Sequence, residues 1–145
     1  MSMPVHTLEN PAFVAPPGKR LAVLGDPIAH SLSPAMHNAA LREMASANPD
    51  LLDWRYEAVH LPADDLLRGL KVLHQAGVIG INLTIPHKVH ALDAVESIDE
   101  KVRPMGAVNT LIRTSTGYRA TNTDGYGIRK AVQEAFKAGF SGRDV

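Results

Sequence analysis

Short apolar runs alternate with stretches of helical periodicity along this chain, and that alternation restricts the fold more than any other feature. Apolar runs at 20–24 and 78–85 and an alternating stretch at 54–59 predict strands. A helix is predicted after the first strand, from 33 to about 47, and another after the second, from 62 to the glycine at 77. Repeated strand–helix units indicate an α/β fold with a parallel sheet and right-handed crossovers.

The second half of the chain adds an antiparallel element to this pattern. A short helix is predicted after Pro86, and strands at 107–113 and 118–121 are predicted to form a hairpin around the loop 114–117. The last predicted helix covers 123–138 and stops at a glycine. The expected architecture is a three-layer α/β sandwich whose mainly parallel, mixed sheet carries an antiparallel hairpin.

Composition excludes several classes of protein. The chain has 145 residues, the size of one domain, and we expect 1–19, rich in proline, to be a flexible leader and 20–145 the domain. Fifteen basic and fifteen acidic residues cancel, so charge favours neither nucleic acid nor a membrane surface as partner. The absence of cysteine excludes disulfides, zinc–thiolate sites and thiol catalysis, and fits the cytoplasm. Nothing indicates a metal, a secretory signal or a membrane span.

Polar residues follow the predicted strands, at the sheet edge where α/β proteins bind ligands. After the first strand, Ser31 and Ser33 stand two residues apart, so both hydroxyls can reach one anion at the start of the next helix. Ser33 before Pro34 is equally the pattern of an ordinary N-cap. Capping explains Ser33 and leaves Ser31 without a role.

The end of the third strand is the most informative stretch. Asn82 and Thr84 interrupt an apolar run at period two, Pro86 ends it, and Lys88 follows at once. Taken alone, this stretch fits a plain strand end with a solvated lysine as well as it fits a binding site.

The hairpin and the last helix supply further polar candidates. Asn109 begins the hairpin region, and Asp124 lies in a first helical turn, where it also complements the helix dipole. Gly125 and Gly127 in the same turn each cost about 1 kcal/mol of helix stability, which suggests that something packs close to the backbone. Lys130 stands where a dinucleotide fingerprint needs its third glycine.

Three histidines, His30, His37 and His87, flank these strand ends and could include a general base. None has a carboxylate at a spacing that fixes its orientation, so the first interpretation is a loop or surface histidine. The combination of lysine, aspartate, hydroxyls and amides suits a small polyhydroxylated acid. A lysine beside an aspartate can pass a proton to or from an alcohol oxygen during hydride transfer.

Four motifs, in order and spacing, resemble the shikimate dehydrogenase family over about Arg20 to Val145. They are Gly25–Pro34 followed by His37-Asn38, Asn82–Lys88, Gly106–Thr110 and Asn122–Gly125. The resemblance implies an NADP-dependent shikimate/3-dehydroshikimate oxidoreductase of the pathway to aromatic amino acids, with shikimate or 3-dehydroshikimate as its partner.

The resemblance also implies roles for individual residues. Ser31 and Ser33 would hold the substrate carboxylate. Thr84, Asn109 and Asp124 would bind its hydroxyls.

The resemblance also implies catalytic and supporting roles for individual residues. Lys88 would be the catalytic acid/base beside Asp124, which shares the catalytic role, and Asn82 would support the site. Glu100 falls where some members place a carboxylate facing the cofactor.

Length is the main departure from the family pattern. Family members continue into a glycine-rich NADP-binding domain, whereas 142–145 lie about where its first strand would begin. We therefore expect a substrate-binding domain that binds substrate without turnover. The alternatives are a non-catalytic shikimate- or quinate-binding module, and the domain of a quinate or aminoshikimate dehydrogenase. The sequence leaves self-association into a homodimer open.

Overall fold

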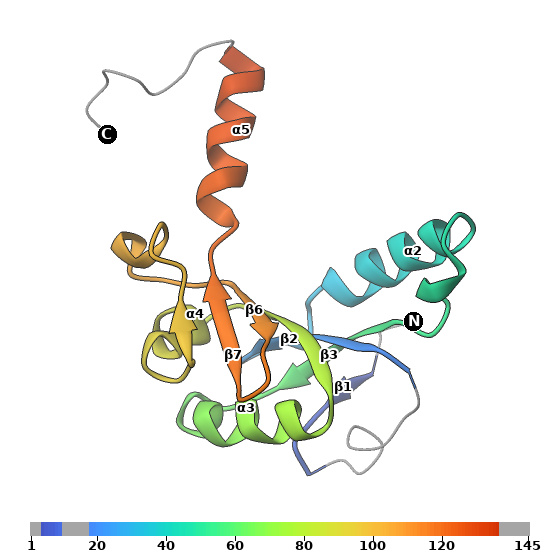
Figure 1. The fold of residues 1–145 in the computed structure, drawn as a ribbon, viewed down its shortest axis with the longest axis horizontal. Coiled ribbons are helices and arrows are strands. Elements are labelled where there is room, and N and C mark those ends of the chain that lie inside the picture. The colour runs from blue at the N-terminus through green and yellow to red at the C-terminus, as the bar shows by residue number, and fades with distance from the viewer. Residues whose placement is uncertain (1–3, 10–17, 137–145) are drawn as a thin grey trace.

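The computed structural model describes residues 4–9 and 18–136, which are organised around one sheet (Figure 1). Within these residues seven strands pair in the order β1-β3-β2-β4-β6-β7-β5. The strands are β1 (Val5–His6), β2 (Arg20–Gly25), β3 (Arg55–His60), β4 (Val78–Leu83), β5 (Ser97–Ile98), β6 (Thr110–Arg113) and β7 (Tyr118–Thr121). The helices are α2 (Ser33–Ala45), α3 (Leu66–Gln75), α4 (His87–His90) and α5 (Asp124–Phe136).

The sheet is mixed, with most pairs parallel. Strands β1, β3, β2 and β4 run parallel to one another, as do β5 and β7. Strand β6 pairs antiparallel with both β4 and β7. The predicted α/β fold, mainly parallel with an antiparallel hairpin, is confirmed.

The two faces of the sheet are covered by different helices. Successive residues of a strand point to opposite sides, so neighbouring residues of one strand pack against different helices. Ala22 and Leu24 of β2 pack in one core cluster together with Leu73 of α3. Val23, between them, packs in a second cluster against Leu41 of α2. The sheet therefore lies between α2 and α3 as the middle of three layers (Figure 1).

Helix α3 allows a matched test of this packing. Leu73 is fully buried, whereas Leu67 on the same helix is 53% exposed. We expect Leu73→Ala to lower the free energy of unfolding by about 2–5 kcal/mol, because it leaves a cavity in the core. Leu67→Ala should cost less than about 1 kcal/mol. Urea denaturation measures both, and equal losses would contradict the assignment of α3 to the core.

Two predicted strands are longer than the observed ones by two or three residues, in both cases because the chain turns where the pattern predicts extension. Strand β4 ends at Leu83 because the His87 amide donates to the Thr84 carbonyl at 2.8 Å and closes a turn. Strand β6 begins at Thr110 because the Val108 amide instead donates to the Lys88 carbonyl, also at 2.8 Å.

The sequence does not predict strands β1 and β5. Val5, inside the expected leader, pairs with Ala58 of β3, and Ile98 pairs with Ala120 of β7. Each strand has only two residues, which is too short for an alternating pattern to be recognised.

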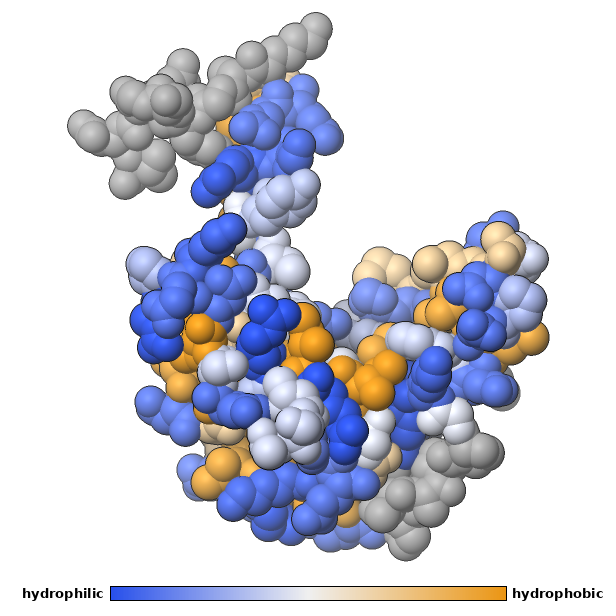
Figure 2. All heavy atoms as spheres, in the orientation of Figure 1, coloured by the Kyte–Doolittle hydropathy of each residue, from blue (hydrophilic) through white to orange (hydrophobic). Residues whose placement is uncertain are grey.

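Helix α5 stands apart from the sheet (Figures 1 and 2). None of its residues is buried, and its apolar side chains Tyr126, Ile128 and Phe136 are exposed. The predicted helix end at 138–139 and the segment 142–145 lie outside the described residues. Across residues 4–9 and 18–136, no helix has both the length and the apolar content that a bilayer span requires.

Candidate active site

A cavity of about 440 Å³ lies at the carboxyl ends of β2 and β4. Because these parallel strands are neighbours, the residues that follow them meet at one edge of the sheet. Figure 2 shows the surface hollowed between α2 and α5, whose first turns both contribute to the lining. The cavity brings together seven of the eight residues predicted for the site: Ser31, Ser33, Asn82, Thr84, Lys88, Asn109 and Asp124.

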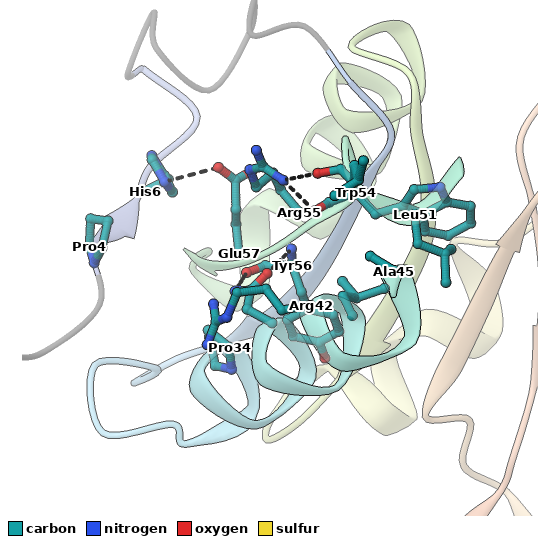
Figure 3. Close-up of a pocket in the computed structure, with 13 residues that line it drawn as sticks. Pro4, His6, Pro34, Arg42, Ala45, Leu51, Trp54, Arg55, Tyr56 and Glu57 are labelled. Atoms are coloured by element: carbon teal, nitrogen blue, oxygen red, sulfur yellow. Dashed lines mark hydrogen bonds and ion pairs between the residues drawn. The ribbon is translucent and has the colours of Figure 1, made fainter. Parts of the chain in front are cut away.

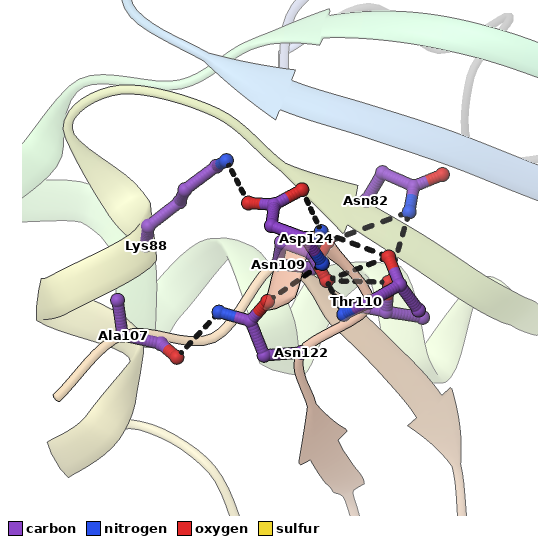
Figure 4. Close-up of polar contacts among 8 residues, drawn as sticks. Asn82, Lys88, Ala107, Asn109, Thr110, Asn122 and Asp124 are labelled. Atoms are coloured by element: carbon purple, nitrogen blue, oxygen red, sulfur yellow. Dashed lines mark hydrogen bonds and ion pairs between the residues drawn. The ribbon is translucent and has the colours of Figure 1, made fainter. Parts of the chain in front are cut away.

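Lys88 and Asp124 form the charged centre of the cavity (Figure 4). The Lys88 Nζ donates to Asp124 Oδ2 at 2.6 Å, and the two side chains are 34% and 48% exposed. The other carboxylate oxygen, Oδ1, accepts a hydrogen bond from Asn109 Nδ2 at 2.7 Å. Both carboxylate oxygens are thus held, and the ammonium faces a cavity into which a small ligand can enter.

Asn109 has one possible amide orientation. Its Oδ1 accepts from the Thr123 backbone N–H at 3.0 Å, and because that group can only donate, the amide nitrogen must face Asp124. Asn122 completes the start of α5: its Oδ1 accepts from the Asp124 amide, and its Nδ2 donates to the Ala107 carbonyl, each at 2.8 Å. The motif at 122–124 therefore fixes the position of the Asp124 carboxylate.

The serine pair differs from the capping prediction. Helix α2 already begins at Ser33, so Ser33 is a helical residue and Leu32 occupies the N-cap position, without a side-chain capping hydrogen bond. Ser31 Oγ instead accepts from the Ser33 amide at 3.3 Å. The expected Ser33 cap is therefore wrong, and the Ser33 hydroxyl has no hydrogen bond within the described part of the chain. Both serines line the cavity beside the N-terminus of α2.

Glycines permit two close contacts around the site. A Cβ built on Gly25 would lie 2.4 Å from Thr84 Cγ2, so glycine lets Thr84 approach the end of β2. A Cβ on Gly125 would lie 2.6 Å from Met105 Cε, so the Met105 side chain packs close to the backbone there, as the glycine predicts. The same expectation is wrong for Gly127, where nothing lies within 4 Å.

Glu100 is the predicted site residue that does not line the cavity. Its carboxylate pairs with Arg103 three residues on, at 3.2 Å, and its side chain is 81% exposed. Its role toward a cofactor stays a prediction.

The three histidines have different environments. His30 is exposed and lines the cavity, and His37 stacks on Tyr56. His87 is fully buried, and its Nε2 donates to the Leu61 carbonyl at 2.8 Å. Its Nδ1 is buried without a hydrogen-bond partner, which makes His87 a structural residue rather than a base facing the ligand.

The burial of His87 predicts a loss of stability in acid. Burial lowers the pKa of His87 below its usual 6.5, despite the hydrogen bond to Leu61, so below pH 6.5 the unfolded chain binds this proton more readily than the folded one. Its contribution to the free energy of unfolding is therefore complete above about pH 6.5 and falls as the pH drops. Urea denaturation at several pH values should show this fall, and His87→Gln should reduce it. A variant with the same pH dependence as the wild type would contradict the role of His87.

Two further cavities are lined by none of the eight predicted site residues. One of about 500 Å³ lies between β3 and α2, and one of about 440 Å³ lies between α3 and the β6–β7 hairpin. Within the described residues, no group of three or more His, Asp or Glu side chains is placed to hold a metal ion.

Comparison with known sequences decides the family. A family model described as the shikimate dehydrogenase substrate binding domain matches residues 23–111, more than half of the chain. The chain belongs to the shikimate dehydrogenase family.

Individual sequences and solved structures are similar to most of this chain. The shikimate dehydrogenase (NADP(+)) of Synechocystis is 43% identical over 125 residues, 86% of this chain and 41% of the relative. The crystal structure of Thermus thermophilus shikimate 5-dehydrogenase in complex with NADP(H) and shikimate matches with a TM-score of 0.72 and 37% identity, over 81% of this chain and 42% of that one. Ligand-free 5-ketofructose reductase of a Gluconobacter species has a TM-score of 0.73 and 27% identity, over 81% and 40%. The chain spans about two fifths of the length of these shikimate dehydrogenase relatives.

Proposed function

We propose that this chain is the substrate-binding and acid/base domain of an NADP-dependent shikimate dehydrogenase, which converts 3-dehydroshikimate and NADPH into shikimate and NADP. The observation that carries the proposal is the Lys88–Asp124 pair, 2.6 Å apart, in a cavity shared with the other predicted substrate-binding residues. Family membership and the names of the relatives support the same reaction.

Substrate orientation follows from the two sides of the cavity. Ser31 and Ser33, with the positive end of the α2 dipole, offer hydroxyl donors to a carboxylate on one side. On the other side Thr84, Asn109 and Asp124 offer the donors and acceptors that hydroxyl groups require. A ring acid held at both ends is fixed in one orientation, which is what stereospecific reduction of one carbonyl needs.

We assign the transfer of the proton to and from the substrate oxygen to Lys88. Reduction of a carbonyl places negative charge on its oxygen, and an ammonium group in contact with that oxygen stabilises the charge and delivers the proton. In the oxidation of shikimate, the neutral amine of Lys88 takes the hydroxyl proton. Asp124 holds Lys88 in position and accepts the hydroxyl hydrogen bond that aligns the reacting oxygen.

The residues that the structure describes carry no dinucleotide fingerprint. Lys130 stands where the third glycine of a fingerprint belongs, and β7, the strand before Gly125, forms an antiparallel hairpin with β6 rather than part of a βαβ unit. We therefore assign NADP to a separate domain and expect this chain to bind shikimate without turnover. The proposal includes a cytoplasmic location, supported by the lack of cysteine, and a homodimer, which size-exclusion chromatography with light scattering tests.

Turnover in a chimera tests the proposed function. In this chimera, the chain replaces the part of the Synechocystis relative that it matches, and the relative supplies the rest of its own sequence. We expect the chimera to reduce NADP when given shikimate, and the chain alone to show no such activity. A folded chimera that binds NADP but does not oxidise shikimate would contradict the function. NADP-dependent oxidation of shikimate by the chain alone would contradict the assignment of NADP to a separate domain.

Quinate serves as an alternative substrate in the same assay, whereas 5-ketofructose, being a ketone, is tested in the reverse direction by following the oxidation of NADPH. The similarity to 5-ketofructose reductase makes a neutral polyhydroxylated ketone the main alternative. The serine pair favours an acid, because a ligand without a carboxylate leaves the N-terminus of α2 without a negative charge.

A further inference from the structure

Tyr56 is a buried residue next to the proposed active site, and three other residues contact it. It belongs to β3, lines the cavity between β3 and α2 (Figure 3), and is only 3% exposed. Asn38 of α2 bonds to both backbone groups of Tyr56, donating to the carbonyl at 2.7 Å and accepting from the amide at 3.0 Å. The ring of His37 stacks on the Tyr56 ring at 4.2 Å, with 13° between the planes.

The Tyr56 hydroxyl contacts an active-site residue, because it donates to Asn82 Oδ1 at 2.7 Å. The direction of this hydrogen bond is fixed by the other end of the Asn82 amide, which lies 3.4 Å from the Asn109 carbonyl and 3.2 Å from Thr110 Oγ1. A carbonyl can only accept, so the Asn82 nitrogen must face Asn109. The Asn82 oxygen therefore faces Tyr56, and the phenol must be the donor.

The same directionality continues to the charged pair (Figure 4). Thr110 Oγ1 accepts from Asn82 and donates to Asn109 Oδ1 at 2.9 Å. Asn109 in turn donates to Asp124 Oδ1. Every link from Tyr56 to Asp124 thus has one donor and one acceptor, and reversing any one of them places two donors or two acceptors against each other.

We propose that Tyr56 is a positioning residue of the active site, whose hydroxyl holds the Asn82 amide from the side opposite Asn109 and, through Thr110 and Asn109, supports the Asp124 carboxylate that pairs with Lys88. This proposal deepens the proposed function and rests on it. Burial raises the pKa of Tyr56, so its hydroxyl stays protonated and remains a donor across the neutral range.

A second buried tyrosine provides a matched control. Tyr118 is 2% exposed, and its hydroxyl donates at 2.8 Å to the backbone carbonyl of Val78, which is not part of the site. Tyr56→Phe and Tyr118→Phe each remove one buried hydroxyl and one hydrogen bond while keeping the ring. Any effect that follows from lost stability alone should appear in both variants.

Nuclear magnetic resonance of the ligand-free chain gives the first readout. In Tyr56→Phe we expect the side-chain amide resonances of Asn82 and Asn109 and the carboxyl carbon resonance of Asp124 to move away from their wild-type positions. In Tyr118→Phe they should stay. The second readout is the shikimate dissociation constant, which we expect to rise about threefold to tenfold in Tyr56→Phe and to stay unchanged in Tyr118→Phe.

The two readouts separate the two levels of the proposal. Identical amide and carboxyl resonances in both variants would overturn the positioning role of Tyr56, whatever the chain binds. A wild-type chain that does not bind shikimate would instead overturn the proposed function. Equal loss of shikimate binding in both variants would show a stability effect and would also overturn the positioning role.

Discussion

Lys88→Ala is expected to lower the turnover of shikimate by the chimera about 10²- to 10⁴-fold, with a change in shikimate affinity of less than about tenfold. The reason is that Lys88 supplies the proton of the reaction, whereas the carboxylate and the other hydroxyls of the substrate are held by other residues. Steady-state kinetics give the turnover, and calorimetric titration of the chain gives the affinity.

Two control variants sharpen the Lys88 experiment. Lys88→Arg keeps the charge beside Asp124 but should lose most of the turnover, because a guanidinium does not give up its proton in a protein. Lys71→Ala removes an exposed lysine from α3, which lies outside the cavity, and should leave turnover unchanged. A large loss of affinity with unchanged turnover in Lys88→Ala would remove Lys88 from the acid/base role.

Asp124→Asn should reduce both turnover and affinity. The carboxylate accepts from Lys88 and from Asn109, one on each oxygen. An asparagine at this position must direct its NH₂ group at one of these two donors, which breaks one hydrogen bond and leaves Lys88 without a counter-charge. We expect turnover to fall about 10²-fold and shikimate affinity about tenfold.

An exposed ion pair of similar geometry provides the control for Asp124→Asn. Asp65 accepts from Arg68 Nε at 3.0 Å at the start of α3, outside the cavity. Asp65→Asn should change neither turnover nor affinity, because exposed ion pairs contribute less than about 1 kcal/mol. Wild-type activity in the Asp124 variant would show that the Lys88–Asp124 contact is only a surface ion pair.

The central sheet could be predicted because its strands are long enough to show a pattern. The runs that became β2 and β4 are mostly apolar over six residues, as buried parallel strands are, and the run that became β3 alternates over its six residues. β1 and β5 carry no such signal, since two paired residues do not form a period. Their existence depends on neighbouring strands with free edges, which is a tertiary property.

The members of the site were predictable, but their connections were not. The carboxyl ends of parallel strands share one edge, so Ser31, Thr84 and Lys88 come together once the strands are assigned. Tyr56 has no such signal, because a buried aromatic residue in an alternating strand normally indicates core packing. Its hydroxyl matters only because β3 places it next to Asn82.

The same limit explains the Ser33 prediction. Serine before proline predicts a cap, and the difference between a cap and a first helical residue is a backbone torsion that residue identity does not encode.

Titration of shikimate into the isotopically labelled chain tests the central claim most directly. The account predicts saturable binding, with shifts concentrated at residues that line the cavity: Ser31, Ser33, Thr84, Lys88, Asn109 and Asp124. Binding should weaken when Ser31 and Ser33 are both replaced by alanine. No saturable binding, or shifts centred instead on the cavity between β3 and α2, would contradict the account.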